Sequence, residues 1–247
     1  MKLSIRTLAL ILMLAGLQIG LAKPPANLAP VSLAGYELTA QETGSKVKIT
    51  FTYDANTFAQ TGPSSDTNLN DFTAGNYTYL NTGPATGIIT NTDIGFMEDL
   101  GATNVVAIYV TFHNATAGSY TWTNNDSYGA GMFKLSALKK NVVPASLAGQ
   151  TLSLGSKGGP VLTFDDAGNY SSTQNGLTHT GTYNFTQFSP TVGVIDQSFT
   201  GDEAGAIGFI LLDFKSATAG YGVGNYYNVP AFGSNPDDSG HANFKLK

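Results

Sequence analysis

The sequence contains no cysteine, a single tryptophan and few charged residues, which make up 12% of its 247 positions. Without cysteine the chain can form no disulfide and can carry no lipid on a cysteine side chain, so apolar burial and backbone hydrogen bonds must stabilise it. Lysine and arginine together number 12, against 17 aspartate and glutamate residues. Because nucleic acid binding needs clustered basic side chains, this composition argues against a nucleic acid partner.

Long apolar runs are also scarce. The only one, Leu8 to Leu21, follows the basic residues Lys2 and Arg6 and ends in Gly20-Leu21-Ala22, whose small residues suit a signal-peptidase site. We therefore predict a signal peptide over residues 1–22 and no transmembrane helix after its cleavage. Ten basic and seventeen acidic residues remain in the mature chain, a net charge of −7. We expect this chain to be secreted, either extracellular or periplasmic, in a bacterial host.

The mature sequence is composed of two similar halves. Pro30-Val31-Ser32-Leu33-Ala34-Gly35 returns as Pro144-Ala145-Ser146-Leu147-Ala148-Gly149. Further matches follow in the same order, pairing Ile49–Phe51 with Leu162–Phe164, Gly75–Tyr79 with Gly181–Phe185, Tyr120 with Tyr221, and Phe133–Leu135 with Phe244–Leu246. So many matches in one order indicate a tandem duplication. The predicted organisation is a Pro-rich segment over 23–29, a first repeat over 30–135, a linker over 136–143 and a second repeat over 144–247.

Within each half the apolar residues recur at every second position. Val47, Ile49, Phe51 and Tyr53 alternate with polar residues, as in a strand with one buried face. Turn residues separate short strands of this kind, whereas only Ile94–Leu100 is compatible with a helical turn. The sequence therefore predicts an all-β fold of two tandem homologous antiparallel β-modules. Each would have about seven or eight strands, arranged as a barrel or a sandwich, and the modules would pack on each other.

One strand of each half is apolar on both faces. In the segments 105–112 and 207–214 the residues that would face away from their own core are apolar too. Such strands are usually covered on both sides. We therefore predict that the two repeats pack through the outward residues of these strands, namely Val105, Ala107, Tyr109, Ile207, Phe209 and Leu211. A surface for a partner protein is the alternative.

The repeated Leu33-Ala34-Gly35 and Leu147-Ala148-Gly149, each before a first strand, give the sequence a family resemblance. A Leu-x-Gly entry, meandering hairpins and a unit of about 105 residues resemble the calycin-type up-and-down barrels, which include lipocalins and avidins. The resemblance covers each repeat once. It implies a small apolar or amphiphilic ligand held inside a barrel, because about eight strands enclose space for one small molecule.

The residue types of catalytic and metal sites are sparse. The sequence has no Gly-x-Ser-x-Gly motif, and His113, His179 and His241 show no metal-ligand spacing. We expect no catalytic residues and no cofactor. The oxygen-rich loop that includes Asp237 and Asp238 is a weak candidate for calcium, and solvated turn carboxylates are the favoured explanation of it.

Aromatic residues offer a second kind of binding site. Copy one carries Tyr120, Trp122 and Tyr128, and the matching region of copy two carries Tyr221, Tyr226 and Tyr227. Exposed rings can stack on sugar faces, so these six residues are candidate ligand-binding positions, while core packing is the alternative. The sequence thus predicts a non-catalytic module that binds a small ligand, a glycan or a partner protein, or that acts as an envelope or adhesion scaffold. The alternatives are an outer-membrane β-barrel and, less supported, a hydrolytic enzyme with a loop-assembled site.

Overall fold

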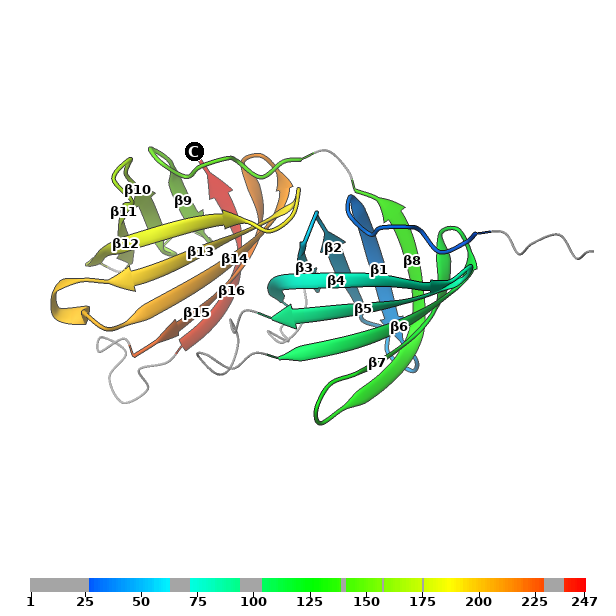
Figure 1. The fold of residues 1–247 in the computed structure, drawn as a ribbon. Helices are drawn as coiled ribbons and strands as arrows, with labels where there is room; N and C mark the ends of the chain where they lie inside the picture. The colour runs from blue at the N-terminus through cyan, green and yellow to red at the C-terminus, as the bar shows by residue number, and fades with distance from the viewer. Residues whose placement is uncertain are drawn as a thin grey trace, which may run out of the picture.

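The structure is a computed structural model that describes residues 27–62, 72–93, 104–138, 141–156, 158–174, 176–228 and 238–247. These residues form two closed antiparallel barrels of eight strands each, packed together (Figure 1). The predicted all-β duplication is therefore confirmed, and both modules are barrels rather than sandwiches. Within these ranges the chain forms no helix with the length and apolar character needed to cross a membrane. The predicted signal peptide and the segment 94–100 lie outside the described residues.

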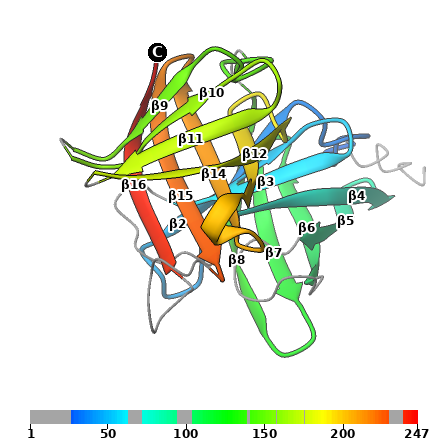
Figure 2. The same cartoon turned by 90° about the vertical axis from the view of Figure 1, so that its left-hand side faces the viewer.

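Both barrels are simple meanders in which each strand pairs with the next and the last pairs with the first. The first barrel consists of β1 (Tyr36–Glu42), β2 (Lys48–Tyr53), β3 (Thr57–Thr61), β4 (Thr73–Gly83), β5 (Thr86–Asp93), β6 (Val105–Asn114), β7 (Ala117–Thr123) and β8 (Tyr128–Ala137). The second consists of β9 (Thr151–Leu154), β10 (Val161–Phe164), β11 (Asn169–Gln174), β12 (Leu177–Gln187), β13 (Val192–Phe199), β14 (Ile207–Ser216), β15 (Ala219–Tyr227) and β16 (Asp238–Leu246). A 3-10 turn, Gly201–Glu203, follows β13 and is drawn as the coiled ribbon in Figure 2.

Each barrel is closed at one end by the segment that precedes its first strand. In the first barrel, Leu33 is fully buried, and the backbone N–H groups of Leu28 and Ala29 donate to the carbonyl of Pro84. In the second barrel, Leu147 is fully buried, and the N–H of Val142 donates to the carbonyl of Pro190. These segments join the aromatic cores at this end, so any open cavity lies toward the opposite end.

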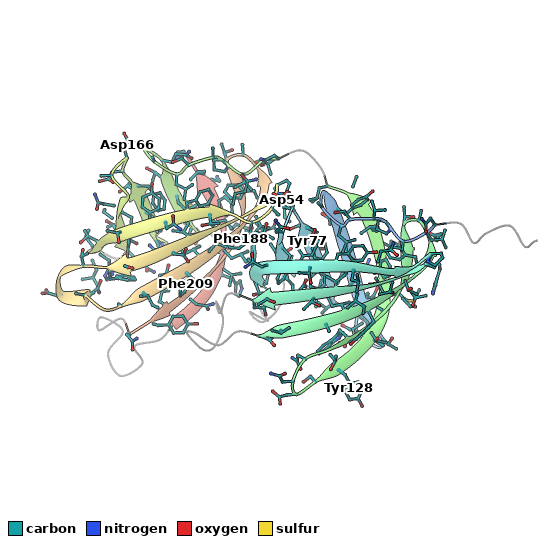
Figure 3. The ribbon with its side chains drawn as sticks, viewed as in Figure 1. Asp54, Tyr77, Tyr128, Asp166, Phe188 and Phe209 are labelled. Atoms are coloured by element: carbon teal, nitrogen blue, oxygen red, sulfur yellow. The ribbon has the colours of Figure 1, made fainter. Side chains whose placement is uncertain are left out.

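The duplication extends to individual hydrogen bonds. In the first barrel the hydroxyl of Tyr77 donates to the carbonyl of Asp54 at 2.9 Å, and both residues are labelled in Figure 3. In the second barrel Tyr183 makes the same bond to Asp165 at 3.2 Å. In both places the tyrosine fixes the hairpin that follows the second strand of the barrel. This agreement supports a common origin for the two halves.

The barrels meet through surfaces of unlike character. The second barrel contributes apolar side chains on the outer wall of β13–β15, which we call the docking face: Val192, Val194, Leu211, Tyr221 and Val223. The first barrel contributes small residues on the outer wall of β2–β4, which we call the receiving face: Thr52, Ala59, Thr61 and Ala74. All nine residues are buried. Small side chains let the two walls approach closely, so the apolar area of the docking face is removed from water.

Two specific contacts fix this interface. The rings of Phe72 and Tyr221 lie 5.6 Å apart between centroids, with Phe72 reaching across from the first barrel. The hydroxyl of Thr57 donates to the carbonyl of Phe188 at 2.7 Å. Figure 3 shows Phe188 at the junction of the two barrels.

The structure differs from the predicted interface in the contribution of the first repeat. Leu211 lies in the interface, and Phe209 packs against it, while Ile207 is half-buried. Val105 and Tyr109, however, are 43% and 48% exposed, and Ala107 shares their outward wall away from the second barrel. The prediction paired equivalent strands of both repeats, whereas the observed interface joins different walls of the two barrels.

Candidate functional site

The open end of the first barrel contains a cavity of about 460 Å³. It lies where the strands end or begin at the side opposite the closing segment. Its apolar lining consists of Leu38, Ala40, Ile49, Phe51, Val106, Ile108, Val110, Tyr120 and Trp122. Its polar lining consists of Glu42, Gln60, Thr73, Asn91, Asp93, Asn104, Asn124 and Ser127. A volume of this size falls in the range of sites for small molecules, which are about 300–1,000 Å³.

Two aromatic residues of β7 form one wall of the cavity. Tyr120 and Trp122 point inward because they alternate with outward Ser119 and Thr121 along the strand. The Trp122 indole N–H donates to Glu42 Oε1 at 3.1 Å, which holds the ring across β8. Burial raises the pKa of Tyr120 to about 12, and the nearby Glu42 carboxylate adds to the effect. Tyr120 therefore keeps its proton and can act as a hydrogen-bond donor to a ligand.

Glycine in β8 makes room for these two rings. A Cβ at position 131 would lie 2.8 Å from the Tyr120 hydroxyl, and one at position 129 would lie 2.3 Å from the Trp122 indole nitrogen. Both distances are shorter than real Cβ contacts, so the rings lie directly over glycine backbone. Gly129 and Gly131 thus determine where the aromatic wall is placed.

The acidic groups of the cavity give it a distinct chemistry. Burial raises the pKa of Asp93 from 3.8 to about 6, although a hydrogen bond with the Asn104 side chain opposes the shift. On the same strand Asn91 is 2% exposed, and its Oδ1 has no hydrogen-bond partner among the described residues. Among the described residues that line the cavity, none is lysine or arginine. The site is therefore suited to a neutral or positively charged polar group at its rim, near Glu42 and Asp93.

The second barrel has a smaller cavity of about 250 Å³ at its open end. Strand register identifies the equivalent positions and explains the difference. Leu154 stands at the position of Ala40, and Phe199 stands at that of Asp93. Gly222 and Gly224 replace Tyr120 and Trp122, and the space is taken by other rings, including Tyr226. The same barrel frame thus encloses different volumes in the two repeats.

The mouth of the second cavity carries one polar pair. His179 lines this cavity, and its Nδ1 lies 2.6 Å from Glu203 Oε2 on the 3-10 turn. Tyr170 and Gln197 also line the cavity, and the Tyr170 hydroxyl and the Gln197 Oε1 are buried without hydrogen-bond partners among the described residues. Burial raises the pKa of Tyr170, so its hydroxyl stays neutral.

The six aromatic candidates occupy five different environments. Tyr120 and Trp122 line the cavity of the first barrel, and Tyr226 lines that of the second. Tyr221 belongs to the docking face, and Tyr227 packs near Phe209 with ring centroids 6.4 Å apart. Tyr128 is 87% exposed in the β7–β8 hairpin and points away from the body of the barrel (Figure 3). The structure therefore does not gather these six rings into one surface.

The two calcium candidates fall at the edge of the described residues. Asp237 and the side chain of Asp238 lie outside them. Among the residues that are described, no group of three or more histidine, aspartate or glutamate side chains is arranged to hold a metal ion.

Sequence reasoning missed Ala40, Asn91 and Asp93. Asn91 and Asp93 are in phase with the buried Ile89 on β5, so the alternation that predicted the strand already placed two polar groups on its inner face. That phase was the available signal. Ala40 carried none, since its importance depends on the larger Leu154 at the equivalent position.

Comparison with known proteins gives no family for this chain. No family model matches the sequence, and no curated protein matches it.

Proposed function

We propose that this protein is a non-catalytic binding protein whose first barrel holds one small, mainly apolar molecule. The observation that carries the proposal is the cavity of about 460 Å³ in the first barrel, with apolar walls and a polar rim. A β-barrel interior has few alternatives, because a barrel of eight strands is either filled by its own side chains or left with room for one ligand. Here the interior has room.

The cavity chemistry narrows the ligand class. At about 30 Å³ for each water-sized unit, the volume admits roughly fifteen non-hydrogen atoms. The apolar residues at its base suit an alkyl or aromatic body, and Glu42 and Asp93 at the rim suit a hydroxyl or ammonium head group. A carboxylate ligand would meet two acidic residues and no lysine or arginine among the described lining. The ligand class proposed is therefore a neutral or cationic amphiphile.

The proposed setting is outside the cytoplasm. The basic and apolar pattern of residues 1–22 supports export, and the lack of cysteine is compatible with a bacterial host. The meander topology supports the resemblance to calycin-type barrels, a family that implies a ligand site inside the barrel. Partitioning between water and detergent tests the alternative, an outer-membrane barrel, which would enter the detergent phase.

The test uses Trp122, the only tryptophan of the chain, as an internal reporter. Three ten-carbon probes are titrated separately: 1-decanol, decylamine and decanoate. Because Trp122 lines the cavity, binding of decanol and decylamine should shift its emission and raise the melting midpoint. Decanoate should bind at least about ten-fold more weakly, which corresponds to about 1.4 kcal/mol. Absence of any shift with all three probes, each titrated up to its solubility limit, contradicts the proposal.

Substitutions at alanine provide the matched control. Ala40→Leu introduces the residue of the second barrel at the equivalent position and should abolish binding by filling the cavity. Ala145→Leu makes the same change at an exposed position before the second barrel and should leave binding unchanged. Both variants are checked for their melting midpoints. If Ala40→Leu binds decanol as tightly as the wild type does, the ligand is not held in this cavity.

A further inference from the structure

The duplication means that each face of the interface between the barrels has a counterpart elsewhere on the molecule. The central row of the docking face runs across three paired strands as Val194, Leu211 and Val223. By strand register its counterpart on the first barrel is the row Ile88, Tyr109 and Thr121. The central row of the receiving face, Thr52, Ala59 and Ala74, has its counterpart on the second barrel in Thr163, Ser171 and Thr180.

The counterpart of the docking face carries much of the exposed apolar area of the first barrel. Tyr109 is 48% exposed, and Leu80, which lies in the same cross-strand row beyond Ile88, is 61% exposed. Met132 and Tyr128 on β8 extend the surface, at 54% and 87% exposed. A shallow hollow of about 340 Å³ lies beside Tyr109 and Tyr128. Clustered apolar side chains of this kind mark interaction surfaces.

The counterpart of the receiving face has the small residues that such a contact needs. Thr163, Ser171 and Thr180 have short side chains, as Thr52 does on the receiving face. Their hydroxyls already have partners, because Thr163 donates to Ser171 and Thr180 pairs with Thr200 at 3.2 Å. Covering this surface would therefore leave these hydroxyls hydrogen-bonded.

We propose that the exposed counterpart of the docking face binds a second copy of this chain, at the counterpart of the receiving face on its second barrel. The partner is argued from the interface within one chain, where surfaces at the same repeat positions are already joined. Such a contact is head-to-tail, since it joins two different surfaces. Repeated, it produces a ring or an open filament in which barrels of the first and second kind alternate. The proposal does not depend on what the cavity holds.

The contact between chains should be weaker than the contact within one chain. Its anchor rings are missing: Ser119 stands at the position of Tyr221, and Thr178 stands at the position of Phe72. Tyr109 and Thr121 are also more polar than the Leu211 and Val223 that they replace. Assembly is therefore expected to depend on protein concentration, with single chains in dilute solution.

The experiment uses two variants that each remove one surface. Tyr109→Lys places a charge on the first barrel's counterpart of the docking face, and Ser171→Lys places one on the second barrel's counterpart of the receiving face. Ser136→Lys adds the same charge at an exposed position of β8 outside both rows. Sedimentation velocity measures the mass of each protein over a hundred-fold range of concentration, and circular dichroism checks that each variant is folded.

Head-to-tail contact gives a result that no symmetric dimer gives. The wild type and Ser136→Lys should grow beyond two chains as concentration rises, and each of the other two variants should remain a single chain. An equimolar mixture of Tyr109→Lys and Ser171→Lys should form a complex of two chains and no more, because one intact surface remains on each. A wild type that stays a single chain throughout, or a Ser171→Lys variant that still self-associates, overturns the proposal.

Discussion

Replacing Asp93 with asparagine should change the dependence of stability on pH. Burial raises the pKa of this carboxyl from 3.8 to about 6 in the folded protein. Between these two values the folded chain holds a proton that the unfolded chain has released, so the free energy of unfolding falls as pH rises. One pKa unit corresponds to about 1.36 kcal/mol, so the loss attributable to Asp93 is about 3 kcal/mol and is complete above about pH 7.

Urea unfolding of the wild type and Asp93→Asn, followed by Trp122 fluorescence, measures this difference in the barrel that contains both residues. The variant should match the wild type near pH 4, where the carboxyl is protonated, and should be more stable by about 3 kcal/mol near pH 7. Asp126→Asn, at an exposed position of the β7–β8 hairpin, is the control and should change stability little at either pH. An advantage of Asp93→Asn that is equal at both pH values refutes the reasoning, since it would not come from a buried charge.

Two further predictions concern packing. Phe164→Ala should cost about 3–5 kcal/mol of unfolding free energy because its ring is 3% exposed, whereas Phe51→Ala should cost less because Phe51 is half-buried and borders the cavity; urea unfolding compares the two, and equal losses would mean that the cavity wall is packed as tightly as the core. In a double-mutant cycle, Phe72→Ala and Tyr221→Ala should show a coupling energy of about 0.5–1.5 kcal/mol for their ring contact. Additive effects would contradict that contact.

The alternation of apolar residues was sufficient to predict the fold class. It gave the strands and, as seven or eight, their number in each repeat, because the alternation of buried and exposed side chains along a strand is a local property. It left barrel and sandwich open, since closure depends on the pairing of β1 with β8, which are about a hundred residues apart.

Errors of one or two residues in the alignment of the repeats affect which way the side chains are predicted to point. The sequence pairs Tyr120 with Tyr221, but strand register pairs Tyr120 with Gly222. A shift of one residue exchanges the faces of a strand, so Tyr120 lines a cavity while Tyr221 belongs to the docking face. A shift of two does less harm: Phe51 is equivalent to Leu162 rather than Phe164, and all three point inward.

The cavity and the interface were beyond prediction from sequence for a different reason. The free volume inside a barrel is the small difference between the volume that the strands enclose and the volume of the side chains that fill it. Ala40 in place of leucine, and the close approach of two rings to Gly129 and Gly131, enlarge that difference in the first barrel. The interface likewise depends on how the two finished barrels are oriented, which strand patterns do not encode.

The segment that closes one end of the second barrel limits how far the two barrels can move apart. The segment that closes this barrel belongs to the connection between the two barrels, because Val143 and Leu147 are buried in the second core only a few residues after β8 ends at Ala137. From Asn141 on, the connection is thus part of the second barrel and offers little slack as a tether. A second-barrel fragment begun after Val143 should lose stability. Separating the two barrels would likewise pull this closing segment out of the second barrel. The separation of the barrels and the unfolding of the second one should therefore occur as one event.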